Sequence, residues 1–199
     1  MIWLLVQRLI ALVAIGVLSP LLIVVAITVI SDSGLPIFHR GVRVGLNGRV
    51  FHIVKFRTMR RDATGSRVTA DDDLRITRIG RRLRRHRLDE LPQLWNVVVG
   101  DMALVGPRPE APRFVDSDTQ DWSVILSVRP GITGPTQLRH LDEATLLRGA
   151  DPEGVYRRDV LPGKIASDLA YVRERSVRGD LTLLMATARA LIGRREDSR

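Results

Sequence analysis

LIALVAIGVLSPLLIVVAITVI, residues 9 to 30, contains no charged side chain over 22 positions. As an α-helix this stretch would be about 33 Å long, which matches the roughly 30 Å hydrocarbon core of a bilayer. A cleaved signal peptide is a poor interpretation, because the apolar stretch is too long and no clear small-residue cleavage site follows it. The stretch therefore predicts a helix that enters a membrane.

Two features bear on how this helix lies in the membrane. Ser19-Pro20 stands at its centre, where proline removes a backbone hydrogen bond and favours a kink. Arg8 precedes the stretch, whereas most basic residues follow it, so the positive-inside rule keeps the bulk of the chain cytoplasmic. A helix that bends at Ser19-Pro20 and returns to the same face satisfies both features. A straight span also tolerates a proline, so the residues alone leave both topologies open.

The charge of the chain is strongly positive and is carried almost entirely by arginine. There are 31 Lys and Arg against 22 Asp and Glu, a formal net charge of +9, and Lys55 and Lys164 are the only lysines. The planar guanidinium group binds phosphates bidentately, so we expect a phosphate-bearing partner: nucleic acid, a nucleotide or anionic lipid. The absence of cysteine excludes disulfides and thiolate metal sites, and the four histidines lack metal-ligand spacing.

A β-hairpin is predicted after the apolar stretch. In GVRVGLNGRVFHIVKFRTM, residues 41 to 59, Asn47-Gly48 separates two β-rich runs, and both turn residues must accept a positive φ. Lys55 and Arg57 stand two residues apart near the end of the second run and therefore on the same side of it. Without further information, a solvated strand end is the plainest interpretation of these two cations.

A basic amphipathic helix is predicted next. Ile76, Ile79 and Leu83 recur at spacings of three and four, which gives one apolar face. Arginines cover the remaining surface: Arg75, Arg78, Arg81, Arg82, Arg84, Arg85 and Arg87. Such a helix commonly lies on an anionic membrane surface, with DNA as the rival partner.

Two adjacent carboxylates, Asp89 and Glu90, follow these arginines, and Pro92 is well placed to begin a second helix. Guanidinium groups and a helix amino terminus keep carboxylates ionised. A surface ion-pair cluster is the commonest meaning of such a pattern. A glycosidase acid/base pair is disfavoured, because adjacent residues rarely place both groups across one scissile bond. An aspartate nucleophile that forms an aspartyl-phosphate is chemically sound. The residue types alone leave the choice open.

Three longer blocks resemble the signature blocks of a known family, in the same order. They are VGLNGRVFHIVKFRTM (44–59), LDELPQLWNVVVGDMALVGPRPE (88–110) and VRPGITGPTQ (128–137). The chain resembles the bacterial sugar transferases, the monotopic phosphoglycosyl transferases that start glycoconjugate and exopolysaccharide assembly on a polyprenyl carrier. The resemblance extends from the apolar stretch to LPGKIASDLAYVRERSVRGDLTLLMATARALI (161–192), essentially the full chain.

This resemblance implies a mainly α fold with a small β-hairpin, in the α+β class. Residues 1–33 would form a re-entrant membrane helix kinked at Ser19-Pro20, with both ends cytoplasmic. Residues 34–199 would form a compact cytoplasmic catalytic domain with amphipathic interfacial helices. The implied location is the cytoplasmic face of the bacterial inner membrane.

The resemblance also assigns roles to individual residues. Asp89 matches the family's nucleophile, and Glu90 matches the carboxylate that holds Mg²⁺. Basic positions around the substrate diphosphate match Lys55 in the KFRTM block, Arg84 five residues before the aspartate, and Arg108 in the Gly-Pro-Arg-Pro block. Arg129 is a further match, although its block is equally consistent with a structural turn.

The implied reaction is a two-step phosphoryl transfer. Asp89 would attack the β-phosphate of a UDP-sugar with release of UMP, and a polyprenyl phosphate (undecaprenyl phosphate) would then take the phosphosugar from the carboxylate. Phosphoryl transfer depends on positioning and on neutralising charge, which arginines, a lysine and Mg²⁺ supply. Mg²⁺ needs only one or two carboxylates plus substrate phosphates, so no His or Cys cluster is required.

The chain departs from the family pattern in two places. The acidic residue usual early in the membrane helix is missing after Gln7-Arg8. Leu141 stands where family members usually have an arginine that is implicated in substrate binding. The sugar therefore cannot be carried over from better-known members.

Two other hypotheses use the same residues. A membrane-tethered nucleic-acid-binding protein would use the basic helix, but no recognised DNA-binding motif accompanies it, and we expect no nucleic-acid partner. A catalytically inactive scaffold of the same fold is opposed by the retained acidic pair and basic positions. The expected partners are a UDP-sugar, a polyprenyl phosphate and membrane lipid, while the sequence leaves the oligomeric state open.

Overall fold

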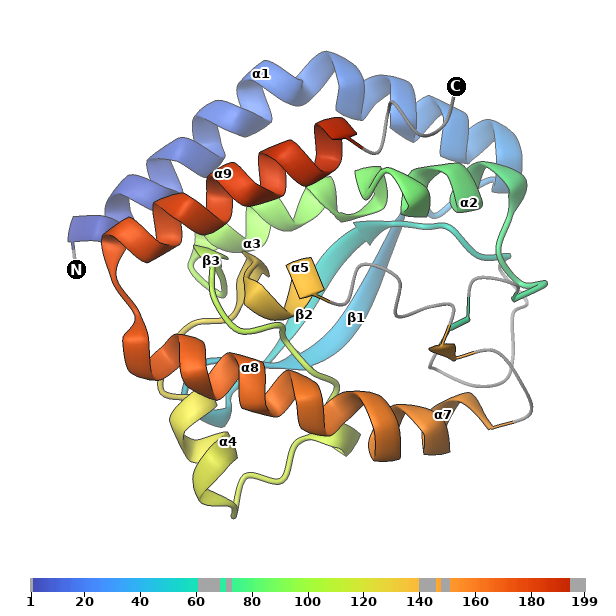
Figure 1. The fold of residues 1–199 in the computed structure, drawn as a ribbon. Coiled ribbons are helices and arrows are strands. Elements are labelled where there is room, and N and C mark those ends of the chain that lie inside the picture. Colours follow the sequence, from blue (N-terminus) through green and yellow to red (C-terminus); the bar gives the residue numbers. More distant parts are fainter. Residues whose placement is uncertain (1, 61–68, 71–72, 140–145, 148–150, 194–199) are drawn as a thin grey trace.

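The computed structural model describes residues 2–60, 69–70, 73–139, 146–147 and 151–193. Within this part of the chain helices dominate, which confirms a mainly α fold. The helices are α1 (Ile2–Ser33), α2 (Arg78–Arg85), α3 (Leu94–Val99), α4 (Gln120–Ile125), α5 (Pro135–Arg139), α7 (Pro152–Val155), α8 (Leu161–Glu174) and α9 (Val177–Gly193). The strands are β1 (Phe38–Val44), β2 (Val50–Phe56), β3 (Ala103–Val105) and β4 (Gly131–Thr133). Figure 1 shows α1 along one side of the molecule and α8 along the other.

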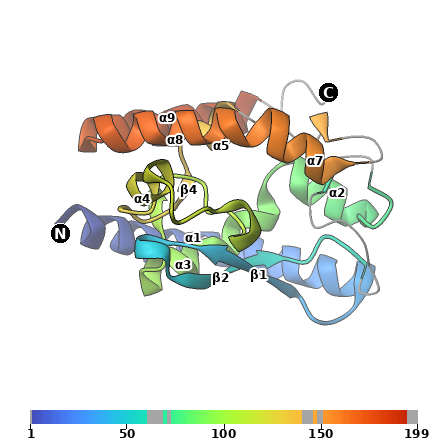
Figure 2. The ribbon, with the colours of Figure 1, turned by 90° about the horizontal axis from the view of Figure 1, so that it is seen from below.

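The elements form two layers. In Figure 2, α7, α8 and α9 lie in one layer, and α1, α3 and the β1–β2 hairpin lie in the opposite one. The chain between these layers includes α4, α5 and β4. The acidic pair belongs to η2 (Leu88–Gln93), a 3₁₀ turn that joins α2 to α3. This turn contacts β2 on one side and α2 on the other, so it lies where the hairpin meets the basic helix.

Helix α1 is bent but not interrupted. It continues through Pro20, and Figure 1 shows it as an arch over the rest of the molecule. Proline cannot donate the hydrogen bond that the carbonyl oxygen of Gly16 would otherwise accept. The Ser19 hydroxyl donates to that oxygen instead, at 2.8 Å. The Ser19-Pro20 pair predicted to kink the helix therefore lies in a curved, continuous α1.

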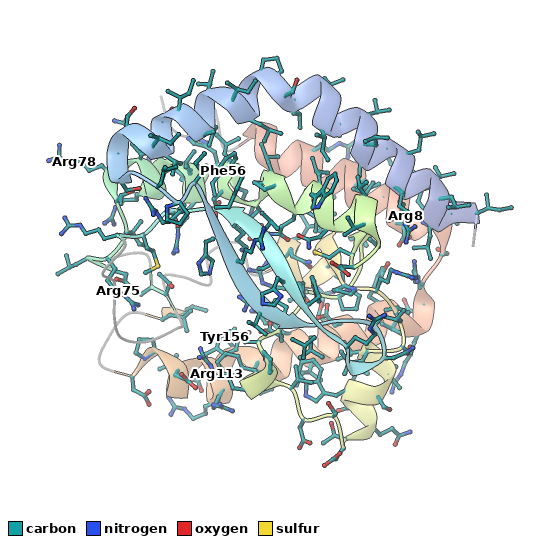
Figure 3. All side chains as sticks on the ribbon, turned by 180° about the vertical axis from the view of Figure 1, so that it is seen from behind. Arg8, Phe56, Arg75, Arg78, Arg113 and Tyr156 are labelled. Carbon is teal, nitrogen blue, oxygen red and sulfur yellow. The ribbon has the colours of Figure 1, made fainter. Side chains whose placement is uncertain are left out.

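The outer face of α1 is apolar and exposed. Its mean hydropathy reaches 2.9 over an 18-residue window of which only 11% is buried, so α1 is not a core helix. Among the described residues it is the one helix long and apolar enough to cross a membrane. Figure 3 shows side chains along this helix that point away from the molecule.

The inner face of α1 packs on the domain along both halves. Ala11, in the first half, joins a buried cluster with Phe51 and Val97. Val25 and Val29, in the second half, join another cluster with residues of β2 and α2. Both ends of α1 also make polar contacts with the rest of the domain, through Trp3 at its start and Gly34 just beyond its end.

The predicted hairpin is present. Strands β1 and β2 are antiparallel, with His39 opposite Lys55 and Val44 opposite Val50. Asn47 and Gly48 both have a positive φ, 53° and 75°, as their sequence predicted. They belong to a short 3₁₀ turn, η1 (Leu46–Gly48), so the loop is longer than a minimal two-residue turn.

The basic helix is shorter than its apolar spacing predicted. Thr77 caps α2, and its side chain accepts a hydrogen bond from the Gly80 N–H at 2.9 Å. Ile76 lies before the helix and forms a β-bridge with Met59, so its burial does not come from a helical face. Arg87 lies beyond the helix, in a left-handed conformation.

A short parallel pairing of β3 with β4 was not predicted. Ala103 pairs with Gly131 and Val105 with Thr133. The two backbones approach so closely that a Cβ at Gly131 would lie 2.1 Å from the Gly106 nitrogen. The glycines of the VGPRP and RPGITG blocks are therefore required by backbone packing.

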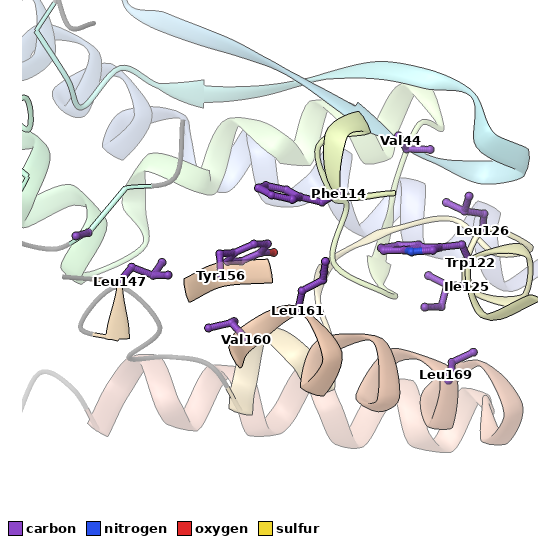
Figure 4. Packing of buried hydrophobic residues seen from close by; sticks show 11 residues of the cluster. Val44, Phe114, Trp122, Ile125, Leu126, Leu147, Tyr156, Val160, Leu161 and Leu169 are labelled. Carbon is purple, nitrogen blue, oxygen red and sulfur yellow. The ribbon is translucent and has the colours of Figure 1, made fainter. Parts of the chain in front are cut away.

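The layer that contains α7 and α8 has its own core. Figure 4 shows its buried side chains, among them Phe114, Trp122, Tyr156 and Leu161. The rings of Phe114 and Tyr156 are 4.6 Å apart. Phe114 belongs to the loop between β3 and α4, so this core holds that loop against α8 and its neighbours.

Gly80→Ala should destabilise the protein. A Cβ at position 80 would lie 2.1 Å from the carbonyl oxygen of Thr58, which is backbone, so α2 would be pushed away from the segment that follows β2. Overpacking of this kind costs about 1–3 kcal/mol or more, measurable by thermal unfolding of the detergent-purified chain. Gly16→Ala is the matched control, because nothing lies within 4 Å of its added Cβ. Equal losses from both substitutions would contradict the role of this contact.

Candidate active site

The acidic pair follows a strained residue. Arg87 has φ 53° and ψ 22°, a left-handed conformation that non-glycine residues rarely adopt. Such conformations cost of the order of 1 kcal/mol or more and persist where surrounding contacts hold them. The Arg87 side chain has such contacts, with Glu90 at 3.5 Å and with the carbonyl oxygen of Gln137 at 3.4 Å. The turn that presents Asp89 and Glu90 is therefore held by the residue that precedes it.

Glu90 is surrounded by three cations from separate parts of the chain. The Lys55 ammonium, on β2, donates to Glu90 Oε1 at 2.6 Å. Arg87 Nη1 lies 3.5 Å from Oε2, and Arg108 Nη2, on the loop after β3, lies 3.8 Å from Oε1. Burial alone would raise the pKa of Glu90, but the charges of Lys55, Arg108 and Arg87 outweigh it and lower that pKa. Glu90 is therefore ionised.

Asp89 has the opposite environment. It is 7% exposed, and no side chain in the described residues donates a hydrogen bond to its carboxylate. Burial raises the pKa of Asp89, and the neighbouring Glu90 charge raises it further, while Lys55 and Arg84 oppose the change. One carboxylate of the pair is thus fixed by cations, and the other is buried but not bound by a side chain.

Arg84 lies beside this pair and is held by a hydroxyl. Its Nε donates to Thr58 Oγ1 at 2.8 Å. Burial lowers the pKa of Arg84, and the charge of Asp89 is the strongest effect that opposes this. The charges of Arg84 and Asp89 therefore act on each other.

The structure brings together most of the basic residues predicted from the sequence. Lys55 and Arg108 contact Glu90 directly, and Arg84 lies near Asp89. Lys55 is not a solvated strand end, because its side chain is only 19% exposed. Leu141, which stands at a departure from the family pattern, lies outside the described residues.

Arg129 lies elsewhere. Its Nε donates to the carbonyl oxygen of Gly100, at the carboxyl end of α3, at 2.9 Å. Arg8 also lies against Gly100, since a Cβ added to Gly100 would be 1.9 Å from Arg8 Nη2. Among the described residues the contact of Arg129 is thus with a helix end and not with the acidic pair. Its phosphate-binding role stays a prediction.

Sequence reasoning missed Arg87 and Thr58 as parts of the site. Arg87 was one of seven arginines that were all assigned to the polar surface of the predicted basic helix. Thr58 follows Arg57 in the KFRTM block, but its hydroxyl gains a role only because α2 places Arg84 against it. Without the fold, nothing in the sequence distinguishes Arg87 from the adjacent arginines or Thr58 from the rest of its block.

The donor set at the acidic pair fits a magnesium ion. The described residues contain no cluster of three or more His, Cys, Asp or Glu side chains, which a closed zinc site would need. The two carboxylates are adjacent, and within the described part of the chain Glu90 Oε2 has only the long 3.5 Å contact with Arg87, while Oε1 is bound by Lys55. Mg²⁺ is commonly held by one or two carboxylates together with water and substrate phosphates.

Comparison with known proteins agrees with this geometry. Residues 2–194 match the family described as "Bacterial sugar transferase". The chain belongs to the bacterial sugar transferase family. The resemblance inferred from the signature blocks is thereby confirmed, and the alternative of a membrane-tethered nucleic-acid-binding protein finds no support among the relatives.

Several relatives are similar over most of this chain. A UDP-N-acetylgalactosamine-undecaprenyl-phosphate N-acetylgalactosaminephosphotransferase of Aeromonas hydrophila is 35% identical over 92% of the chain and 41% of its own length. A UDP-glucose:undecaprenyl-phosphate glucose-1-phosphate transferase of Caulobacter vibrioides is 37% identical over 87% of the chain and 63% of its own length. The exopolysaccharide production protein PSS of Rhizobium leguminosarum is 37% identical over 87% and 86%, respectively. The chain thus spans less than half of the Aeromonas protein.

The Lys55–Glu90 pair should be energetically coupled. Lys55→Met and Glu90→Gln each leave a largely buried charge without its closest partner, since the two side chains are 19% and 13% exposed. We expect each to destabilise, and the double variant to lose less than the sum, with a coupling energy of about 1–3 kcal/mol in denaturant unfolding followed by tryptophan fluorescence.

The exposed pair Arg158–Asp159 is the matched control for this cycle. Its side chains are 68% and 52% exposed at a separation of 3.0 Å. Arg158→Met and Asp159→Asn should show little coupling, because solvent screens exposed ion pairs. Equal coupling in the two cycles would contradict the structural role of the Lys55–Glu90 pair.

Proposed function

We propose that this protein transfers a sugar 1-phosphate from a UDP-sugar to a polyprenyl phosphate such as undecaprenyl phosphate at a membrane surface. One observation carries the proposal. Asp89 is buried and accepts no side-chain hydrogen bond from the described residues, directly beside a Glu90 that three cations keep ionised. The names of the Aeromonas and Caulobacter relatives support the same donor and acceptor classes.

The first step makes Asp89 the nucleophile. A carboxylate oxygen of Asp89 bonds to the β-phosphorus of the UDP-sugar, and the bond from that phosphorus to the bridging oxygen breaks. UMP leaves with the electron pair, and the sugar phosphate stays on the carboxylate. A group held by several hydrogen bonds would have to lose them to attack, and Asp89 has none from side chains in the described residues.

The second step regenerates the carboxylate. A phosphate oxygen of the polyprenyl phosphate attacks the same phosphorus, and the Asp89–phosphorus bond breaks. The products are a polyprenyl diphospho-sugar and free Asp89. The carboxylate of Asp89 is a good leaving group from this mixed anhydride and takes the electron pair of the broken bond, so one active site serves both halves of the reaction.

The cations around the pair have separate tasks. Lys55, Arg84 and Arg108 would neutralise charge on the phosphate oxygens as the phosphorus is transferred. Glu90, with Asp89 beside it, would hold Mg²⁺, which would polarise the phosphoryl group when bound. Arg87, which contacts Glu90, would hold Asp89 and Glu90 in the conformation of the η2 turn.

The contacts at both ends of α1 support a re-entrant topology. Near its start, the Trp3 indole N–H donates to Asp180 of α9 at 2.8 Å. At its end, Arg57 donates to the carbonyl oxygen of Gly34 at 2.6 Å and is itself only 8% exposed. A straight span would separate its ends by about 30 Å of hydrocarbon, whereas here both ends bind the same domain.

The active site would then lie at the level of the lipid headgroups. The exposed apolar side chains of α9, including Leu181 (46%) and Met185 (54%), would rest in the interface beside α1. Arginine-rich α2 would meet the anionic headgroups. We place the protein on the cytoplasmic face of the bacterial inner membrane, with a catalytic domain formed by residues 34–199.

Asp89→Asn should abolish UMP release. Purified wild-type chain with Mg²⁺, undecaprenyl phosphate and a panel of UDP-sugars, beginning with UDP-glucose and UDP-N-acetylgalactosamine, should release UMP. The Asn variant should fold but lose activity by on the order of 10³-fold or more, because it cannot form the acyl phosphate.

Asp101→Asn is the matched control for this test. It changes an exposed carboxylate in the same sequence block and should retain activity. Intact-mass measurement with donor alone should show a phosphosugar adduct on the wild-type chain and none on Asp89→Asn. Release of UMP at the wild-type rate by Asp89→Asn would disprove the nucleophile assignment.

The topology has its own test. The chain has no cysteine, so Leu5→Cys and Leu35→Cys, at positions 57% and 64% exposed, give single labelling sites on either side of the apolar stretch. Both should react with an impermeant maleimide only from the cytoplasmic side of oriented vesicles. Labelling of the two positions from opposite sides would mean a true span, and the re-entrant arrangement would be abandoned.

A further inference from the structure

The loop that carries Arg108 has a single backbone donor at its centre. Pro107 and Pro109 have no N–H, so between them only Arg108 can donate. Its N–H donates to Asp168 Oδ2, on α8, at 3.3 Å. The other oxygen of Asp168 accepts the Thr136 hydroxyl of α5 at 2.5 Å. Asp168 is 5% exposed, and Thr136 is fully buried.

Both ends of the same loop are fixed by strands. The Gly106 N–H donates to the carbonyl oxygen of Thr133 on β4 at 2.9 Å. The carbonyl oxygen of Glu110 accepts the N–H of Val44 on β1 at 3.0 Å. Between these two points the carbonyl oxygen of Pro107 accepts the Gly131 N–H at 2.9 Å, and the Arg108 N–H is held by Asp168. The contact with Asp168 is the one that α8 makes with the Arg108 backbone among the described residues.

Helix α8 presents a second charge to this loop. Lys164 is one turn before Asp168 and lies 3.5 Å from Glu110 Oε1. Its ammonium also donates to the Tyr156 hydroxyl at 3.0 Å. One face of α8 thus places a cation beside Glu110 and a carboxylate beside the Arg108 backbone, which fixes the register of the loop on the helix.

A carboxylate at this position is unfavourable for core packing. Burial raises the pKa of Asp168 to about 7, although the hydrogen bonds from Thr136 and from the Arg108 N–H oppose the rise. An apolar side chain would avoid that penalty. A buried polar group that burdens stability is most simply explained by a function at the site it supports.

We propose that Asp168 is a positioning residue for phosphate binding: it holds the backbone of Arg108 so that the guanidinium, 3.8 Å from Glu90 Oε1, faces the diphosphate of the donor. Asp168 acts through Arg108 and contacts neither Asp89 nor Glu90 among the described residues. The inference rests on the proposed function for its substrate, and on the hydrogen bonds of the loop for its geometry.

Two measurements on the full chain in detergent test the role of Asp168. They are the Kd of UDP by calorimetry, and kcat and KM for UMP release. Asp168→Ala should weaken UDP binding about tenfold and lower kcat/KM about 10- to 100-fold, because a misplacement of about 1 Å has effects of this size. Asp168→Asn keeps an acceptor for the Arg108 N–H and should stay within about threefold of wild type. Equal losses in both variants would overturn the assignment to this hydrogen bond.

A double-variant cycle separates positioning from general stability. If Asp168 acts through Arg108, adding Asp168→Ala to Arg108→Ala should change the Kd and kcat/KM by less than about twofold. Asp180→Ala is the matched control: it removes another buried carboxylate, one that binds Trp3 and Tyr171 instead of the loop. Its effect should be the same in either background. Full additivity of Asp168→Ala with Arg108→Ala would overturn the proposal.

Two further outcomes stay distinct. If Asp168→Ala does not fold, Thr136→Val replaces it, since valine keeps the shape and removes the hydroxyl that orients Asp168. It should weaken UDP binding about threefold to tenfold, and not at all in the Arg108→Ala background. A wild-type chain that binds UDP but releases no UMP from any UDP-sugar would end the proposed function, while the UDP titrations would still decide the role of Asp168.

Discussion

The pairing of Lys55 with Glu90 is the interaction on which the site depends. It joins the hairpin to the turn between α2 and α3. Because Lys55, Arg87 and Arg108 gather on Glu90, two adjacent carboxylates acquire different properties: one is fixed and charged, and the other is buried and available. Without Glu90, the positive charges of Lys55, Arg87 and Arg108 would repel one another.

Much of this arrangement could be predicted from the sequence, because the residues that form it lie in a few contiguous segments. The apolar stretch and the Asn47-Gly48 turn came from residue types and their order, whereas the roles suggested for Lys55, Arg84 and Arg108 came from the resemblance of whole blocks to the family. The β3–β4 pairing and Asp168 could not, because they depend on backbones and side chains far apart in the chain. The start of α2 was also misplaced, since the apolar period continued through Ile76 although Thr77 caps the helix.

The site is assembled from both layers of the molecule. The hairpin layer supplies Lys55, the turn supplies the acidic pair, and the loop that carries Arg108 rests on α8 of the opposite layer. A domain built in this way must keep its layers in register for the cations to converge. Backbone-to-backbone packing of Gly106 against Gly131 and the two charges on α8 maintain that register.

The hydroxyl of Ser19 has a consequence for the membrane itself. Pro20 has no N–H to donate to the carbonyl oxygen of Gly16, and the Ser19 hydroxyl donates to that oxygen instead. The bend of α1 therefore needs no hydrogen bond from outside the helix. Acyl chains can therefore surround the crest of the arch without a water molecule being drawn to that depth. A membrane that surrounds this helix would keep its electrical and proton barrier intact at the bend.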